Sequence, residues 1–208
     1  QKPGGAWEIL IAAQAVLVAV KTWRLSRLLR ALGGSEDAAR IVAPAGSTIL
    51  RFDGAVSPLV DSLERLGRES TYRIGPAQFD HADPRVVELT AHATSLALKP
   101  FAPVHVRARR VAEGVSLSWV RRARLDGDAW DVVDIPLAED FERYELDILG
   151  VGGVVKRTLT SDAASVLYAS SDEIADFGAP QVNLSVALAQ MSAVVGRGFE
   201  RRVNLPIA

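Results

Sequence analysis

An alternating pattern of apolar and polar residues between positions 103 and 119 constrains the fold of this chain more than any other feature. Val115, Leu117 and Trp119 are apolar, and a serine separates each from the next. Successive side chains of a β-strand point to opposite faces, so this pattern places one face against a core and the other in solvent. Tyr144 begins a second segment of the same kind, and we expect Trp119 and Tyr144 to be buried.

Seven segments in the second half of the chain have the length of short strands, and turn residues separate them. They lie near positions 104–111, 114–122, 142–149, 153–159, 164–169, 182–192 and 199–204. Seven short strands with intervening turns are typical of an immunoglobulin-like or fibronectin type III-like β-sandwich. The glycines of the 150–153 and 196–198 segments fit turns in this sandwich.

The first hundred residues are also rich in segments with strand composition. The predicted strands are Trp7–Ala12, Ala15–Val20, Ser47–Phe52, Thr71–Ile74 and Val86–Thr94. Residues 22–34, TWRLSRLLRALGG, have leucines and arginines at helical spacing and predict one short amphipathic helix that ends at Gly33 and Gly34. Leucine spacing also predicts a helix at Pro58–Leu66. Because helices do not alternate with strands here, a small barrel fits this region better than a βαβ fold.

The segment Lys99–Pro103, KPFAP, is the best domain boundary. Two prolines so close together favour an extended connector and resist both helix formation and sheet pairing. We therefore expect a mainly β chain of two domains, a small β-barrel-like domain with one short helix at residues 1–101 and the β-sandwich at residues 102–208.

Composition excludes several classes of protein. The 208 residues carry a formal net charge of -1, so no bulk positive field favours nucleic acid, and we expect none as a partner. Cysteine is absent, which excludes disulfides, thiolate metal sites and a cysteine nucleophile. The longest apolar stretch, Ile9–Val20, is too short to span a bilayer as a helix, so we expect no membrane span. Because the chain begins with Gln1 and its one methionine is Met191, we favour a piece of a longer polypeptide whose N-terminal part is missing.

Two acidic loops are the candidate metal sites. Asp80, His81 and Asp83 could offer ligands, but an aspartate in a loop before proline is more common as turn chemistry. Clustered carboxylates of the LDGDAWDVVDIP segment could hold calcium. They are Asp126, Asp128, Asp131 and Asp134. Because no glutamate closes an EF-hand loop and Asp126-Gly127 forms a hairpin turn more simply, we expect no metal and no cofactor.

The sequence carries no motif for catalysis. It has no Gly-x-Ser-x-Gly elbow, no P-loop and no dinucleotide-binding glycine motif. His92 and His105 fall in strand-like segments, where a packed or edge histidine is the ordinary role. A carboxylate pair such as Glu139-Asp140 could do acid–base work, but the sequence does not set its geometry. We therefore expect no enzyme and no catalytic residues.

Arginines form two groups. Arg24, Arg27 and Arg30 recur every three residues, and such a row is more often a solvated face than a site for phosphate or a partner's carboxylates. The second group flanks the first sandwich strands. Its members are Arg107, Arg109, Arg110, Arg121, Arg122 and Arg124. Basic strands deter unwanted pairing and offer contacts to acidic neighbouring subunits.

The segment TWRLSRLLRALGGSED resembles the Leu-Ser-x-Leu-Leu-Arg-Gly-x-x-Gly-Thr-Glu signature of long tail-hub proteins. These are the baseplate hubs, sometimes called megatron proteins, of siphophages and gene transfer agents. The matching residues are Leu25, Ser26, Leu28, Leu29, Arg30, Gly34 and Glu36. Ala31 stands where glycine is usual and Ser35 where threonine is usual. Later segments, from PFAPVHVRA to VALAQMSAVVGRG, resemble the C-terminal part of the same proteins, although Leu184 stands where fibronectin type III domains usually carry the tyrosine of the corner motif.

The resemblance implies a structural role. Tail hubs are typically trimers around the tail axis that close the tail tube and carry fibres or host-binding parts. This chain would be a virion structural protein at the distal tail or baseplate of a virus or gene transfer agent particle. Its partners would be further copies of itself, other baseplate proteins or fibres, and a host cell-surface receptor involved in host attachment.

Two other interpretations stay open. One is a bacterial surface adhesin or a carbohydrate-binding β-sandwich module, which exposed aromatic residues on a sandwich face would favour. The other is an enzyme, which would need a carboxylate pair such as members of the Asp126–Asp134 group.

Overall fold

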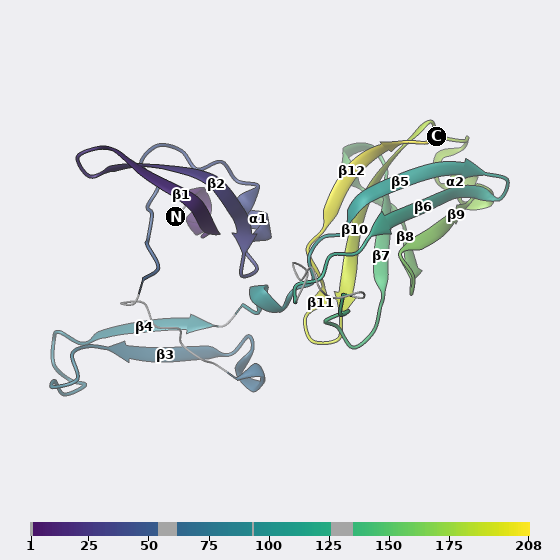
Figure 1. Cartoon of the computed structure of the whole chain (residues 1–208). Coiled ribbons are helices and arrows are strands. Elements are labelled where there is room, and N and C mark those ends of the chain that lie inside the picture. Colours follow the sequence, from purple (N-terminus) through teal and green to yellow (C-terminus); the bar gives the residue numbers. More distant parts are fainter. Residues whose placement is uncertain (1, 54–61, 93, 126–134) are drawn as a thin grey trace.

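The computed structural model describes residues 2–53, 62–92, 94–125 and 135–208, and it confirms a mainly β chain (Figure 1). The strands are β1 (Ile9–Ala19), β2 (Thr22–Leu32), β3 (Glu69–Ile74), β4 (Val87–His92), β5 (Val104–Val111), β6 (Gly114–Val120), β7 (Tyr144–Leu149), β8 (Val155–Ser161), β9 (Ser165–Ala169), β10 (Asn183–Ser192), β11 (Gly196–Arg197) and β12 (Arg201–Pro206). The α-helices are α1 (Glu36–Ala39) and α2 (Ser170–Phe177). Single 3-10 turns are η1 (Pro3–Gly5), η2 (Leu63–Arg65), η3 (Leu96–Leu98) and η4 (Val151–Gly153).

The N-terminal region consists of two hairpins rather than a barrel. Strand β1 pairs antiparallel with β2, and β3 pairs antiparallel with β4, so that each hairpin is a separate two-stranded sheet. Figure 1 shows them as two isolated ribbons. A barrel needs strand pairing that runs continuously around a closed sheet. Among the described residues no such closure exists, so this part of the fold prediction is corrected.

The helix predicted at residues 22–34 is wrong, because this segment forms strand β2. Its register sets Leu25 against Ala15 and Leu29 against Ile11, so pairing with β1 satisfies its backbone groups. Tertiary pairing here overrides the leucine and arginine spacing that predicted a helix. Gly33 and Gly34 follow the element, as predicted, but the element that ends before them is strand β2 rather than a helix.

Other N-terminal predictions have mixed outcomes. The predicted strands Trp7–Ala12 and Ala15–Val20 are one continuous strand, β1, while Thr71–Ile74 and Val86–Thr94 are confirmed as the main parts of β3 and β4. Residues 47–52 are not a strand, because they lack a pairing partner among the described residues. Of the helix predicted at Pro58–Leu66, residues 58–61 lie outside the described residues, and Leu63–Arg65 forms only one 3-10 turn.

The C-terminal region is a two-layer β-sandwich in which all seven predicted strands are present. One sheet has the order β5-β6-β9, and the other has the order β11-β10-β7-β8 with β12 also paired to β10. The two layers face each other in Figure 1. This arrangement is compatible with a fibronectin-like domain. Helix α2, between β9 and β10, was not predicted.

The alternating residues of the sequence form the sandwich core, as predicted. Its largest members from β6, β7 and β10 are buried, and they are Leu117, Trp119, Tyr144, Leu146, Ile148, Leu184, Val186 and Leu188. Trp119 and Tyr144 meet edge to face with ring centroids 5.1 Å apart. Such aromatic pairs stabilise a core beyond the area that they bury. The two sheets therefore have a complete apolar interior of their own.

Charged side chains fasten the outside of the sandwich. Arg197 Nη1 and Nη2 lie 2.6 Å from the carboxylates of Glu145 and Asp147 on β7. Glu173 fastens α2 to the sandwich just before β10 begins. Its carboxylate lies 2.5 Å from Arg110 and accepts a hydrogen bond from the Gln181 amide. Glu173 is only 1% exposed, so this ion pair satisfies a carboxylate that burial would otherwise destabilise.

Tyrosine still anchors this corner, although Leu184 occupies the position where the corner tyrosine is usual. The Tyr168 hydroxyl, on β9, donates to Asp176 Oδ2 at 2.9 Å, and Arg157 holds the same carboxylate at 2.7 Å. Strand β9 thereby ties α2 down before β10 begins. The corner is thus fastened from the preceding strand rather than from β10.

We expect Leu117→Ala to lower the free energy of unfolding of the sandwich by about 2–5 kcal/mol, because it removes buried volume from a fully enclosed position. Leu167→Ala, on the outer side of the same sheet and 47% exposed, is the matched control and should change it by less than about 0.5 kcal/mol. Urea denaturation followed by tryptophan fluorescence measures both. Equal losses for the two variants would contradict the assignment of the core face.

Candidate assembly interface

The hairpin β1–β2 has one face made mainly of apolar residues, which we call the ribbon face. Two residues that are opposite each other in the register have side chains on the same face of the hairpin. Residues two positions apart on one strand also have side chains on the same face. The ribbon face comprises Ile11, Ala13, Ala15, Leu17, Trp23, Leu25 and Leu29, and the same register places the exposed Arg27 among them, opposite Ala13. Leu17, Trp23 and Leu29 are 56%, 58% and 59% exposed, so no described part of the chain covers this face.

The hairpin β3–β4 repeats this arrangement on a smaller scale. Ile74 pairs with Val87 and Tyr72 with Leu89, which places these four residues on one face. Three of them, Ile74, Val87 and Leu89, are exposed. The opposite face is polar, because Arg73 lies across from Glu88 and pairs with it at 3.0 Å. The hairpin β3–β4 is therefore amphipathic, and both hairpins have an uncovered apolar side.

These exposed faces have an energetic consequence. An isolated two-stranded hairpin is marginally stable in water, because it has no second layer against which to bury its apolar side chains. Contiguous exposed apolar patches on proteins mark interaction sites. Each ribbon also has unpaired strand edges, which can add a further strand. The geometry fits association with a partner that covers the apolar faces, extends the sheets, or does both.

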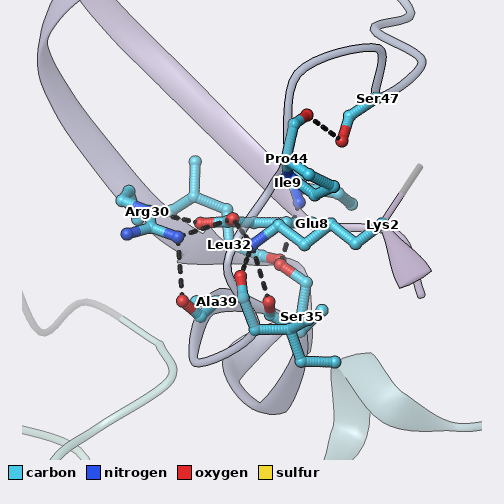
Figure 2. Close-up of polar contacts among 11 residues, drawn as sticks. Lys2, Glu8, Ile9, Arg30, Leu32, Ser35, Ala39, Pro44 and Ser47 are labelled. Carbon is cyan, nitrogen blue, oxygen red and sulfur yellow. Dashed lines mark hydrogen bonds and ion pairs between the residues drawn. The ribbon is translucent and has the colours of Figure 1, made fainter. Parts of the chain in front are cut away.

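A buried carboxylate holds the base of the first hairpin (Figure 2). Glu8, whose side chain is 3% exposed, receives Arg30 Nε at 2.6 Å and Arg30 Nη2 at 2.8 Å on its two oxygens. Lys2 Nζ lies 2.5 Å from the same carboxylate and donates to the carbonyls of Ala38 and Ile41 at 2.7 Å. We call Lys2, Glu8 and Arg30 the ribbon clamp. It joins the N-terminus, β2 and the segment after α1.

The ribbon clamp favours the ionised form of Glu8. Hydrogen bonds from Arg30 and Lys2, together with their positive charges, lower the pKa of the Glu8 carboxyl from 4.5 to about 2, against the opposing effect of burial. Arg30 also donates to the Ala39 carbonyl at 2.8 Å, so one guanidinium links the strand to α1. The clamp is therefore charged and intact at neutral pH.

A tight turn follows the ribbon and packs against the rest of the chain. The Ser35 hydroxyl accepts a hydrogen bond from the Ile9 amide at 2.9 Å and donates to the Leu32 carbonyl at 2.7 Å. Gly34 has φ +81, and a Cβ there would lie 2.2 Å from the Leu96 carbonyl carbon of η3. No residue with a side chain fits at position 34 without moving this backbone.

Glu36 connects the hairpin region to the sandwich. One of its oxygens accepts a hydrogen bond from Arg122 at 2.7 Å, and the other accepts the Ala102 amide at 3.3 Å. Arg40 adds a second link, since it donates to the Glu200 carbonyl at 2.7 Å. We call these contacts the Glu36 latch. They tie α1 to both ends of the sandwich sequence.

The structure explains several residues of the tail-hub signature. Arg30 belongs to the ribbon clamp, Gly34 packs on η3, and Glu36 forms the latch. Ala31, where glycine is usual, has φ +64 and lies in a β-bulge, because the register passes from Ile11↔Leu29 to Ile9↔Leu32. Left-handed backbone at a bulge is a position that glycine fills without steric cost.

Of the two candidate metal loops, the structure describes the one at Asp80–Asp83. Asp80 and Asp83 serve as turn residues, since they accept the amides of Ala82 and Arg85 at 2.8 and 2.9 Å, and Asp83 also pairs with Arg85. His81 lies exposed beside them. Within the described ranges no group of acidic residues and histidines could hold a metal ion. The Asp126–Asp134 loop lies outside the described residues.

The remaining sequence candidates do not converge either. His92 and His105 are exposed on β4 and β5. Glu139 pairs with Arg124 at 3.0 Å, so this carboxylate is occupied by a structural contact. Of the first arginine row, Arg30 enters the ribbon clamp, while Arg24 and Arg27 are exposed. Sequence reasoning did not identify Lys2, Glu8 or the latch, because their partners are distant in the sequence and no local pattern marks them.

Comparison with known proteins gives one family match. Residues 1–50 match the family described as Rcc01698-like, C-terminal. The matched range contains the ribbon face, the ribbon clamp and α1. This match is consistent with the tail-hub resemblance. A comparison with curated proteins finds no match.

Two solved structures are weakly similar to the chain. The rat CD45 extracellular region, domains d3-d4, has a TM-score of 0.34 and 11% identity, and covers 97% of this chain and 98% of that one. The Clostridium perfringens spore cortex lytic enzyme SleM has a TM-score of 0.34 and 11% identity, and the match covers 65% of this chain and 38% of that one. Such low similarity carries no argument about function. The helices in the described part of the chain are too short or too polar to cross a membrane.

We expect Glu8→Gln to weaken the hairpin by about 1–3 kcal/mol at neutral pH, because it leaves the buried Lys2 without its ionic partner. The folded pKa of Glu8 is depressed, so its stabilisation is present above about pH 4.5 and is lost as the pH falls towards about 2. Native-state hydrogen exchange of β1 amides should show this loss in the wild-type chain. A Glu8→Gln variant with the same pH profile would contradict the clamp.

We expect Ala31→Gly to stabilise the hairpin by up to about 1 kcal/mol. The substitution relieves the strain of the left-handed backbone at position 31, and this gain exceeds the cost of the entropy that glycine adds to the unfolded chain. Ala15→Gly, at a regularly paired position of β1, is the control and should destabilise it by about 0.5–1 kcal/mol. The same exchange measurement compares the two. Destabilisation by both substitutions would argue against a left-handed bulge at position 31.

Proposed function

We propose that this chain is a structural subunit of a phage-like tail tip or baseplate, a hub component that associates through its ribbon face. The observation that carries the proposal is the contrast between its two regions. The sandwich buries a complete core, whereas both N-terminal hairpins expose an apolar side. A chain built in this way completes its apolar burial by assembly.

The family match supports a gene transfer agent or phage setting. It covers the residues that form the ribbon and its clamp, and Rcc01698 is a protein associated with a gene transfer agent. Of the signature residues, Arg30 holds the base of the hairpin, Gly34 lets the following turn pack on η3, and Glu36 links α1 to the sandwich.

We further propose a homotrimer at the distal tail, with the sandwich available to fibres or host-binding parts. The ribbons carry two different apolar faces, and pairing one with the other between copies gives a head-to-tail contact that can close into a ring. As the main function of the chain, the alternative of a bacterial surface adhesin or a carbohydrate-binding module has less support than assembly. Exposed aromatic residues on a sandwich face would favour it, but Trp119, Tyr144 and Tyr168 of the sandwich are buried.

We expect Leu17→Glu/Trp23→Glu to abolish self-association of the full chain, because charge on the ribbon face cannot be buried in an interface without a partner. Val151→Glu/Val182→Glu, at sandwich positions 99% and 79% exposed, is the control and should associate as the wild type does. Sedimentation velocity over a range of concentrations measures the mass. A wild-type chain that stays monomeric, or a ribbon variant that still assembles, would contradict the proposal.

Electron cryo-microscopy of tailed particles from the source organism tests the location. Density for this chain in threefold copies at the distal end of the tail is the expected result. Particles that lack the chain would overturn the assignment to the tail, whatever the sedimentation result.

A further inference from the structure

The arginines around the first sandwich strands divide into two sets. Four have partners within the chain, and the partners are Glu173 for Arg110, the carbonyls of Ile135 and Pro136 for Arg121, Glu36 for Arg122, and Glu139 for Arg124. Arg107 and Arg109 are exposed, and their side chains form no hydrogen bond or ion pair with any described residue. These two guanidinium groups therefore have no structural task within this chain.

Arg107 and Arg109 lie on the same outer face of the β5-β6-β9 sheet. Ala108 between them is buried in the core, so alternation turns both arginines outward. Residues two apart on a strand are separated by about 7 Å. The two charges thus stand side by side along β5, at a spacing that one extended ligand can contact.

Small polar residues continue this face across the sheet. Arg107 is opposite Ser118, which in turn pairs with Ser165, and Arg109 is opposite Ser116, which pairs with Leu167. We call these six residues the arginine-serine face. The three strands contain no aspartate or glutamate at all, although the chain has 25 acidic residues. The face carries two positive charges and three serine hydroxyls, together with the exposed apolar side chain of Leu167.

We propose that the arginine-serine face binds an acidic polysaccharide. Guanidinium groups form paired hydrogen bonds with carboxylates, and serine hydroxyls can both donate to and accept from sugar hydroxyls. None of the six residues of the face is aromatic, so the face offers no platform on which nucleic acid bases could stack. An acidic sugar chain supplies both the negative charge and the hydroxyls that this face matches.

This inference goes beyond the proposed function, and it concerns the sandwich rather than the ribbons. It can therefore be tested separately from assembly. A chain that binds sugar but stays monomeric would leave it standing while the assembly proposal failed. A chain that assembles but does not bind sugar would contradict only the proposed sugar site.

Isothermal titration calorimetry of the full chain with polygalacturonate tests the inference, with dextran as the uncharged polysaccharide and poly-L-glutamate as an acidic protein-like chain. We expect binding to polygalacturonate that weakens as sodium chloride is raised, because salt screens exposed charge pairs. Arg107→Ser/Arg109→Ser should reduce the affinity by at least about tenfold. Ser116→Ala/Ser118→Ala keeps the charges and should reduce it by a factor of about 3 or more.

The matched control is Arg68→Ser/Arg201→Ser, which removes two exposed arginine charges from other surfaces and should leave the affinity unchanged. Circular dichroism spectra verify that each variant retains its sheets. The inference is overturned if polygalacturonate does not bind, if the Arg107/Arg109 variant binds as the wild type does, or if poly-L-glutamate binds at least as tightly.

Discussion

A two-stranded ribbon has no second layer, and this constraint governs the N-terminal half of the molecule. The hairpin β1–β2 leaves Leu17, Trp23 and Leu29 more than half exposed, and β3–β4 does the same with Val87. Burying such side chains is the main favourable term in folding. The ribbons therefore depend on contacts outside themselves for most of their stability. Assembly is the source of contacts that best fits these faces.

Within the chain, charged groups hold the first hairpin and link it to the sandwich. Glu8 binds Lys2 and Arg30 at the base of the first hairpin, and Glu36 passes the connection on to Arg122 and the sandwich. Both carboxylates are largely buried, and the cations of Glu8 are positioned by hydrogen bonds to backbone carbonyls. These pairs locate the ribbon face without supplying its missing core. The sandwich, with its own interior, acts as the fixed support.

The sandwich could be predicted from the sequence, because its signal is local. Alternation at Val115, Leu117 and Trp119 identifies the inward face without any knowledge of the partner sheet. The first hairpin could not, since leucine spacing in β2 also fits a helix and only the long-range pairing with β1 decides between them. The ribbon clamp was equally hidden, because Lys2, Glu8 and Arg30 carry no common motif. The tail-hub signature located Arg30, Gly34 and Glu36, although it could not show what each contacts.

The central claim, that the N-terminal ribbon completes its burial by assembly, is tested most directly by hydrogen–deuterium exchange at a series of protein concentrations. The account predicts that the amides of β1 and β2 become protected as the concentration rises, while those of β6, β7 and β10 are protected throughout. Strong protection of β1 and β2 in the dilute monomer would contradict it, as would rapid exchange there at every concentration.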